Sequence, residues 1–157
     1  MAQEIERKFL VDQKQWNQQV KPVGELYRQG YLLTDQHKTI RVRQTPTQGF
    51  LTIKGISIGA TRAEYEYEIP LKEATELLDN FASSELSKIR YTLNFKGKIW
   101  EVDEFLADNV GLLVAEIELN REDERFELPP WVGKEVTSEP IYYNANLTNH
   151  PFKNWLS

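Results

Sequence analysis

Cysteine is absent from this 157-residue sequence, and histidine occurs only twice. Without thiols the chain can form no disulfide, no thiolate zinc site and no thiol nucleophile. Two histidines, His37 and His150, argue against a histidine-rich metal centre and against Ser/His/Asp chemistry. His37 lies in the polar stretch TDQHK and is expected in a turn. Because the lack of cysteine suits a reducing compartment, we expect a cytoplasmic location.

Other common signals are missing as well. No apolar run approaches the ~20 residues of a membrane helix, and no basic-then-apolar leader opens the chain. Neither GxxxxGKS/T nor GxGxxG occurs, so the usual glycine-rich phosphate loops are absent. The net charge of −5 and the pI near 5.2 argue against nucleic-acid binding. We therefore expect no membrane or nucleic-acid partner, while the sequence carries no signal for an oligomeric state.

The residues that are present predict a sheet-rich protein. With 40% hydrophobic and 27% charged residues the chain can bury a core, and its length fits a single domain over residues 1–157. Short segments of alternating character predict strands at roughly 3–11, 26–34, 38–45, 49–56, 62–69, 87–95, 98–105 and 112–120. Glycines in Thr47-Gln48-Gly49 and Lys96-Gly97-Lys98 indicate hairpin turns, which favour antiparallel pairing.

Helices are expected to be few. Pro70 can begin a helix in PLKEATELLDNF, where apolar residues recur at helical spacing. Shorter helices are predicted near residues 12–20 and within the C-terminal NANLTNHPFKNWL, with an interruption before Pro151. The pattern as a whole predicts an α+β fold, mainly antiparallel β, in which a few helices cover a large sheet.

Charged residues occupy alternate positions on nearly every predicted strand. Since strand side chains point alternately to opposite faces, each strand has one charged and one apolar face. For a single strand, the simplest interpretation is an amphipathic sheet with its charged face in solvent. Here, however, the signs are sorted, and like charges two residues apart on a strand lie about 6.5–7 Å apart and repel. The sorted sets are ExE at 4–6, RxR at 41–43, ExExE at 64–68, KxR at 88–90, ExD at 101–103 and ExE at 116–118.

Eight strands can close into a barrel. If the charged faces of the strands point inward, they line its lumen. A dry lumen filled with such charges would be prohibitively unstable, so the lumen must be a wet, charge-binding channel. Carboxylates suit Mg²⁺ or Mn²⁺, and arginine and lysine suit a polyanion. A metal-bound polyphosphate satisfies both sets. The expected lumen residues are Glu4, Glu6, Glu64, Glu66, Glu68, Glu101, Asp103, Glu116 and Glu118 with Lys8, Arg41, Arg43, Lys54, Lys88 and Arg90.

These residues resemble a known family. Glu4-x-Glu6-x-Lys8 is similar to the N-terminal ExExK signature of the CYTH, or triphosphate tunnel metalloenzyme, family, and specifically to its small bacterial triphosphatase-like group. ExExK alone is a weak motif, but the resemblance continues in order over nearly the whole chain. It runs through QGYL (29–32), IRVR (40–43), LTIKG (51–55), EYEYEIP (64–70), KIRY (88–91), WEVDEF (100–105), VAEIEL (114–119) and EVTSEPIYYNANL (135–147).

The resemblance implies an eight-stranded closed tunnel that binds a triphosphate and divalent metal, Mg²⁺ or Mn²⁺. It implies metal contacts from Glu4, Glu6, Asp103, Glu116 and Glu118. It implies phosphate contacts from Lys8, Arg41, Arg43, Lys54, Lys88 and Arg90, and a catalytic set of Glu4, Glu6, Lys8, Glu66 and Glu68. Glu64 and Glu101 share the parity, and Arg62 is expected at the tunnel mouth.

The activity that the resemblance implies is metal-dependent hydrolysis of a small-molecule triphosphate, with inorganic tripolyphosphate as the expected substrate and nucleoside triphosphates as further ones. The alternatives are a class IV adenylyl cyclase that converts ATP to cyclic AMP, and a non-catalytic polyphosphate- or nucleotide-binding module. The outward aromatic residues Tyr65, Tyr67, Tyr91 and Trp100 share the apolar parity and are expected to pack rather than to stack on a base.

Overall fold

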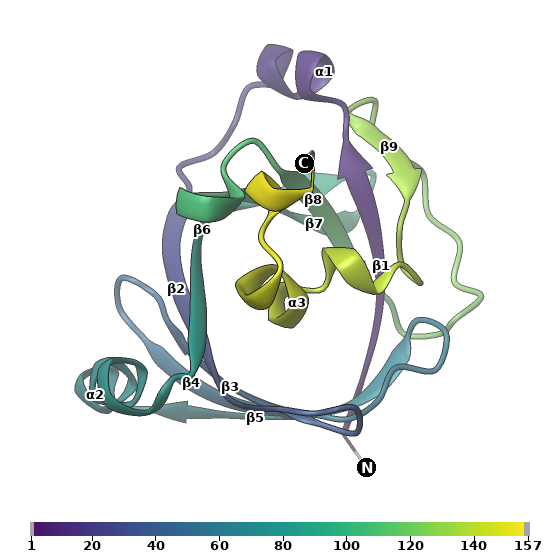
Figure 1. The fold of residues 1–157 in the computed structure, drawn as a ribbon. Coiled ribbons are helices and arrows are strands. Elements are labelled where there is room, and N and C mark those ends of the chain that lie inside the picture. The colour runs from purple at the N-terminus through teal and green to yellow at the C-terminus, as the bar shows by residue number, and fades with distance from the viewer. Residues whose placement is uncertain (1, 156–157) are drawn as a thin grey trace.

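Eight antiparallel strands close into a barrel, as expected from the sequence (Figure 1). The computed structural model describes residues 2–155. Around the barrel the strands follow the order β5-β4-β3-β2-β6-β7-β8-β1, and β1 pairs with β5 to close the ring. They are β1 (Gln3–Val11), β2 (Glu25–Thr34), β3 (Thr39–Gln44), β4 (Gly49–Lys54), β5 (Thr61–Ile69), β6 (Ser84–Phe95), β7 (Lys98–Phe105) and β8 (Leu113–Glu118).

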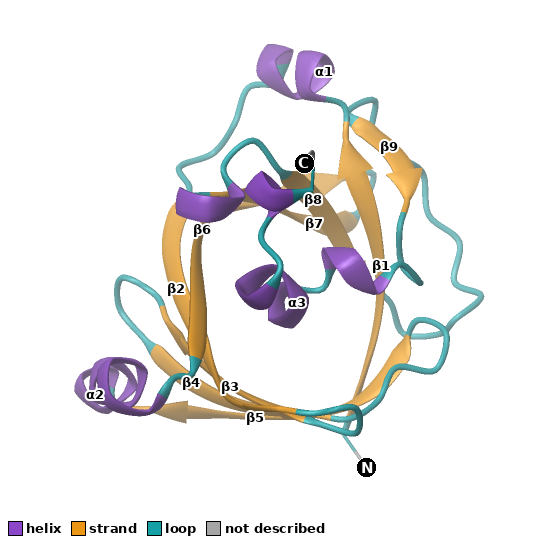
Figure 2. Ribbon diagram, in the orientation of Figure 1, coloured by secondary structure: helices purple, strands orange, loops and turns teal. Residues whose placement is uncertain are grey.

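The predicted strands and helices are found with small differences at their ends. The helices are α1 (Gln13–Gln18), α2 (Leu71–Phe81) and α3 (Asn144–Asn149), with short 3₁₀ turns at Ala107–Asn109, Pro140–Tyr142 and Phe152–Asn154 (Figure 2). Asp12 begins α1, where its carboxylate accepts a hydrogen bond from the Gln15 amide at 2.9 Å. None of the helices in residues 2–155 is long and apolar enough to cross a membrane.

One strand was not predicted. β9 (Val132–Glu135) pairs with the second half of β1, along the edge that β5 leaves free. The first half of that edge pairs with β5, at Gln3↔Ala63 and Ile5↔Thr61. A four-residue strand with Gly133 inside it is too short to show a period in the sequence, so only the free edge of β1 makes it a strand.

The largest hydrophobic cluster lies outside the barrel wall. It packs the outer faces of β1, β7 and β8 against α1 and the segment that precedes β9, with Trp100 and Val102 fully buried. Trp16 of α1 contacts Trp131 edge-to-face at 5.2 Å between ring centroids, and Trp131 contacts Trp100 at 5.9 Å. Apolar burial therefore stabilises the wall without filling the lumen.

A second cluster forms under α2 on another part of the outer wall. Ala74 and Leu78 of α2 pack on Val42 of β3. A Cβ atom on Gly30 would approach Leu78 Cδ2 and the Ala82 Cβ to 2.9 Å, so a glycine on β2 is what allows the helix to lie this close.

The outer aromatic residues do not all pack as expected. Trp100 is buried and Tyr91 is half-buried against the first cluster. Tyr65 and Tyr67 have the predicted outward parity but are 37% and 56% exposed. The packing expected for these two was wrong, because α2 covers the opposite end of this wall and leaves the β5 face open to solvent.

The C-terminal segment covers one end of the barrel (Figure 1). Leu147 of α3 is fully buried and packs with Leu86, Phe105 and Val114, which share the inward parity of their strands. At this end the lumen is therefore apolar and filled, which leaves the charged residues around the remaining space.

We expect Trp100→Ala to destabilise the protein by about 3–5 kcal/mol, because it removes the ring at the centre of the outer cluster and leaves a cavity. Urea denaturation measures the loss. The control is the neighbouring Ile99→Ala, since Ile99 is 53% exposed and its truncation is expected to cost little. Equal losses for the two variants would contradict the placement of the core outside the wall.

Candidate active site

The barrel lumen holds a cavity of about 490 Å³, within the usual range for small-molecule sites. All of the predicted lumen residues line it except Glu68 and Asp103. Arg62 also lines the cavity, beside the loops that join β2 to β3 and β4 to β5. The lining residues from the predicted set are Glu4, Glu6, Lys8, Arg41, Arg43, Lys54, Glu64, Glu66, Lys88, Arg90, Glu101, Glu116 and Glu118.

One wall of the cavity is acidic. β1 and β8 pair so that Glu6 lies opposite Glu118 and Lys8 lies opposite Glu116. Burial, together with the negative charges of Glu116 and Glu4, raises the pKa of Glu6 well above its usual value. Burial also opposes ionisation of Glu116, but Lys8 and a hydrogen bond with Glu6 outweigh it, and the pKa of Glu116 falls well below its usual value. Glu6 therefore keeps its proton to higher pH than Glu116 does.

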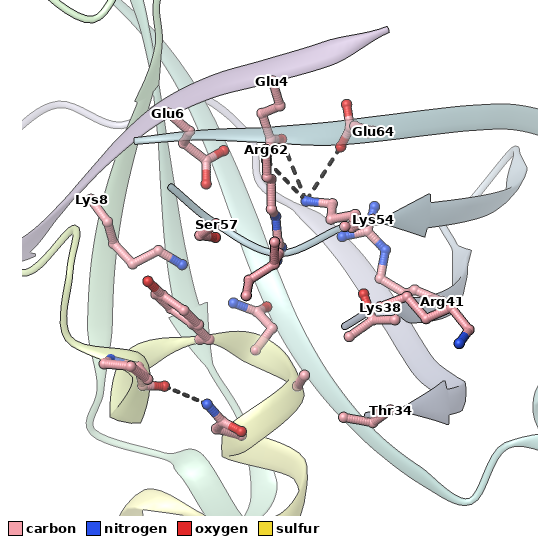
Figure 3. A pocket seen from close by; sticks show the side chains of 18 of the residues that line it. Glu4, Glu6, Lys8, Thr34, Lys38, Arg41, Lys54, Ser57, Arg62 and Glu64 are labelled. Carbon is pink, nitrogen blue, oxygen red and sulfur yellow. Dashed lines mark hydrogen bonds and ion pairs between the residues drawn. The ribbon is translucent and has the colours of Figure 1, made fainter. Parts of the chain in front are cut away.

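Next to this wall, Lys54 is held by two carboxylates. Its Nζ lies 3.2 Å from Glu4 Oε1 and 3.3 Å from Glu64 Oε2, as the dashed lines in Figure 3 show. Arg62 Nε lies 3.7 Å from the same Glu4 oxygen. Burial and the nearby Glu116 raise the pKa of Glu4, but Lys54, a hydrogen bond with Glu64 and Arg62 together more than offset these effects and leave that pKa below its usual value.

On β3, by contrast, Arg43 is held by neutral groups. Among the described residues no carboxylate forms a salt bridge with Arg43; its Nε donates to Gln29 Oε1 at 3.0 Å, and its guanidinium lies 4.9 Å from the Tyr27 ring centroid. Burial, reinforced by the nearby Arg41 and Arg90, lowers the pKa of Arg43 to about 10. A buried guanidinium held by neutral groups keeps its charge available for an anion.

Arg41 also has unused donor capacity. Its Nη2 donates to Thr52 Oγ1 at 3.2 Å and to Glu66 Oε2 at 3.4 Å. Its Nε is buried and has no hydrogen-bond partner among the described residues. An unpaired buried donor is costly, so this position of Arg41 lowers the stability of the fold.

Asp103 lies behind the cations rather than in the cavity. It is fully buried on β7, and its oxygens accept from Lys88 Nζ at 2.7 Å, Arg90 Nε at 2.8 Å and Arg90 Nη2 at 2.9 Å. Burial lowers the pKa of Lys88 to about 7, although Asp103 opposes the shift. In this arrangement Asp103 positions two cations, a different place from the metal-facing one expected from the sequence.

The two acids of the catalytic set on β5 have separate positions. Glu66 contacts Arg41 and also accepts from Thr52 Oγ1 at 3.1 Å, so it orients a basic residue. Glu68 is exposed and accepts a long hydrogen bond from Gln48 at 3.4 Å. Since Glu68 shares the inward parity, its distance from the site follows from its place near the end of β5.

Several lumen residues were missed because they are uncharged. β2 contributes Tyr27 and Gln29, and the segment around α3 contributes Tyr143 and Asn144. Tyr143 places its ring 5.6 Å from Lys8 Nζ. The charge pattern could not reveal these residues. Alternation of Tyr27, Gln29 and Tyr31 was a signal for the inward face of β2, whereas nothing local in the C-terminal segment marks it as part of a cavity.

A divalent cation fits the chemistry of the acidic wall. Glu4, Glu6, Glu116 and Glu118 lie on the two adjacent strands, and Glu6 and Glu116 share a hydrogen bond, so a hard, oxygen-seeking cation would relieve their repulsion. In residues 2–155 no three acidic, histidine or cysteine side chains already stand in metal-binding geometry. Lys54, Arg62 and Lys8 instead balance part of the negative charge.

Known proteins resemble this chain over nearly its whole length. The model of the CYTH domain family matches residues 2–150. A protein of Acetivibrio thermocellus named inorganic triphosphatase is 48% identical over 156 residues, which cover 99% of each chain. One of the same name from Nitrosomonas europaea is 36% identical over 152 residues, with 92% of this chain and 95% of that one covered. A crystal structure of an inorganic triphosphatase aligns with a TM-score of 0.63 at 33% identity, over 94% of this chain and 95% of that one.

We expect Glu6→Gln to stabilise the metal-free protein at pH 8 and to matter less at pH 5. An acid whose pKa is raised in the folded state contributes most to stability below its unfolded pKa, near 4.5, and this contribution is lost as pH rises through the folded pKa. Thermal melting in EDTA at both pH values measures the difference. The control is Glu68→Gln, at an exposed acid of the same inward parity. A lower melting temperature for Glu6→Gln at pH 8 would contradict the crowding of these carboxylates.

Proposed function

The chain belongs to the CYTH domain family, and we propose that it hydrolyses inorganic triphosphate inside the barrel in a reaction that depends on a divalent metal. The proposal is supported by relatives named inorganic triphosphatase that match almost the full length of the chain. The observation that carries it is chemical: buried cations, with Arg43 held by neutral groups, and the carboxylates of β1 and β8 line one cavity. A metal-bound polyphosphate pairs its metal with the carboxylates and its phosphates with the basic residues.

We propose that Glu4, Glu6, Glu116 and Glu118 hold the cation, Mg²⁺ or Mn²⁺. Such an ion supplies charge neutralisation and polarisation of phosphoryl oxygens when it is bound. Asp103 is left out of this set because its oxygens already accept from Lys88 and Arg90 behind the cavity surface.

The basic residues bind the phosphate chain. Arg41 and Arg43 on β3 and Arg90 on β6 can each present two donors to phosphate oxygens, while Lys8, Lys54 and Lys88 act as point charges. These groups are held in place before substrate arrives, so they can stabilise charge that develops on the phosphoryl oxygens during water attack. Glu66 contributes by orienting Arg41. Glu68 is not assigned a catalytic role, because it does not line the cavity.

Lys88 is fixed at the side of the cavity. Its Nζ donates to Asp103 Oδ2 and to Asn144 Oδ1, both at 2.7 Å. We propose that Lys88 contributes to phosphate binding.

The remaining expectations from the sequence are retained as proposals. A single domain over residues 1–157, a cytoplasmic location and the absence of nucleic-acid partners rest on length, on the cysteine-free composition and on the charge of −5. The substrate is a small triphosphate.

A substrate panel tests the proposed activity. With Mg²⁺ or Mn²⁺, we expect phosphate release from tripolyphosphate to be faster than from ATP or thiamine triphosphate, and EDTA to abolish it, because the carboxylate wall then lacks its counter-charge. Phosphate release and cyclic AMP are measured in the same reactions. Formation of cyclic AMP and pyrophosphate from ATP would identify a cyclase, and tight tripolyphosphate binding without turnover in any metal would identify a binding module.

Substitutions on the two walls are expected to differ in effect. Glu116→Gln should lower kcat about 100-fold while the fold survives, since it removes a charge from the metal site. Arg41→Ala should raise KM about tenfold or more through the loss of phosphate contacts. Steady-state kinetics and circular dichroism measure both effects. Lys72→Ala, on the exposed face of α2, is the control and should be silent. Unchanged KM in Arg41→Ala would remove that residue from the phosphate site.

A further inference from the structure

Two neutral amides hold cations of the cavity. Arg43 Nε donates to Gln29 Oε1 at 3.0 Å, and Gln29 Nε2 donates to Asn144 Oδ1 at 3.0 Å. The same Asn144 oxygen accepts from Lys88 Nζ at 2.7 Å. A continuous chain of hydrogen bonds therefore joins β3, β2, α3 and β6 along one side of the cavity, and Gln29 is fully buried within it.

The other cations are held differently. Lys54 is flanked by Glu4 and Glu64, and Arg90 contacts both Asp103 and Glu101. Those carboxylates fix the geometry of the cations but also neutralise part of their charge. An amide oxygen accepts the same hydrogen bond without adding a negative charge. Arg43 has no carboxylate partner among the described residues, and Lys88 has only Asp103.

We propose that Gln29 and Asn144 are positioning residues that orient Arg43 and Lys88 without adding a negative charge beside the triphosphate. The amides, rather than the cations alone, then set the affinity of this side of the cavity for phosphate. This inference rests on the proposed function for the identity of the anion. It also gives the C-terminal segment a part in the site, since Asn144 is the first residue of α3 and reaches Lys88 from outside the barrel strands.

Asn144→Asp separates this role from a purely structural one. Aspartate has the same shape and still accepts from Lys88 and Gln29, so a structural role predicts that it is tolerated better than Asn144→Ala, which loses both bonds. If the amide instead serves to avoid negative charge, Asn144→Asp should bind the triphosphate more weakly than Asn144→Ala, because aspartate adds a negative charge beside the phosphates. The two explanations therefore rank the same pair of variants differently.

The experiment measures tripolyphosphate binding by calorimetry in EDTA, with melting temperature recorded for each variant. We expect Asn144→Asp to weaken binding by at least about tenfold, and by more than Asn144→Ala does, while it melts no lower than Asn144→Ala. Gln18→Glu adds the same charge on the exposed face of α1 and should bind as wild type does. Tripolyphosphate binding to Asn144→Asp that equals or exceeds binding to Asn144→Ala would overturn the proposal.

The amide on β2 provides a second test in case an Asn144 variant does not fold. Gln29→Glu keeps the acceptor for Arg43, loses the donor to Asn144 and adds a charge, whereas Gln29→Ala loses both hydrogen bonds. Gln29→Glu should bind tripolyphosphate more weakly than Gln29→Ala while it melts no lower; weaker binding by Gln29→Ala overturns the proposal. Phosphate release by the wild-type protein with Mg²⁺ is measured separately. Wild-type binding without hydrolysis would reject the proposed function and leave this inference intact, whereas hydrolysis with the reversed order of variants would reject the inference alone.

Discussion

The placement of apolar burial outside the barrel wall is the constraint on which the rest of this structure depends. Trp100, Val102 and Ile117 face outward and are buried under α1 and the segment that precedes β9. Because strand side chains alternate, the same strands must present their other face to the lumen. The wall gains its stability from the outer clusters, and the lumen is thereby released from the need to be apolar. A charged cavity can exist inside a stable fold only on this condition.

The lumen charges are balanced by two kinds of contact. Carboxylates hold Lys54 and Arg90, which offsets the desolvation of these cations but neutralises part of their charge. Hydrogen bonds to neutral groups and an aromatic ring hold Arg43 instead, and its charge is not cancelled. The combination gives a cavity that is stable without ligand and still attracts a polyanion. The acidic wall on β1 and β8 provides the complementary place for a cation.

Much of the fold and of the charged site was predictable from the sequence, for a local reason. Period-2 alternation identified the eight barrel strands, and the sorted signs of Glu4 and Glu6 or Arg41 and Arg43 indicated a lumen rather than a solvent face. The features that the sequence did not predict depend on contacts between distant parts of the chain. β9 exists because β5 leaves half of one edge of β1 unpaired. Tyr65 and Tyr67 are exposed because α2 covers a different part of the outer wall.

The sequence by itself determined which face of each strand is charged, because the alternation of side chains is a property of the extended backbone alone. It also determined the family, through motifs that follow one another in order along the chain. Only the tertiary structure decided how the charges are shared. It placed Asp103 behind Lys88 and Arg90, left Arg43 with an amide, and brought Asn144 from α3 to Lys88. These contacts join residues far apart in the chain, and their distances depend on how the barrel closes.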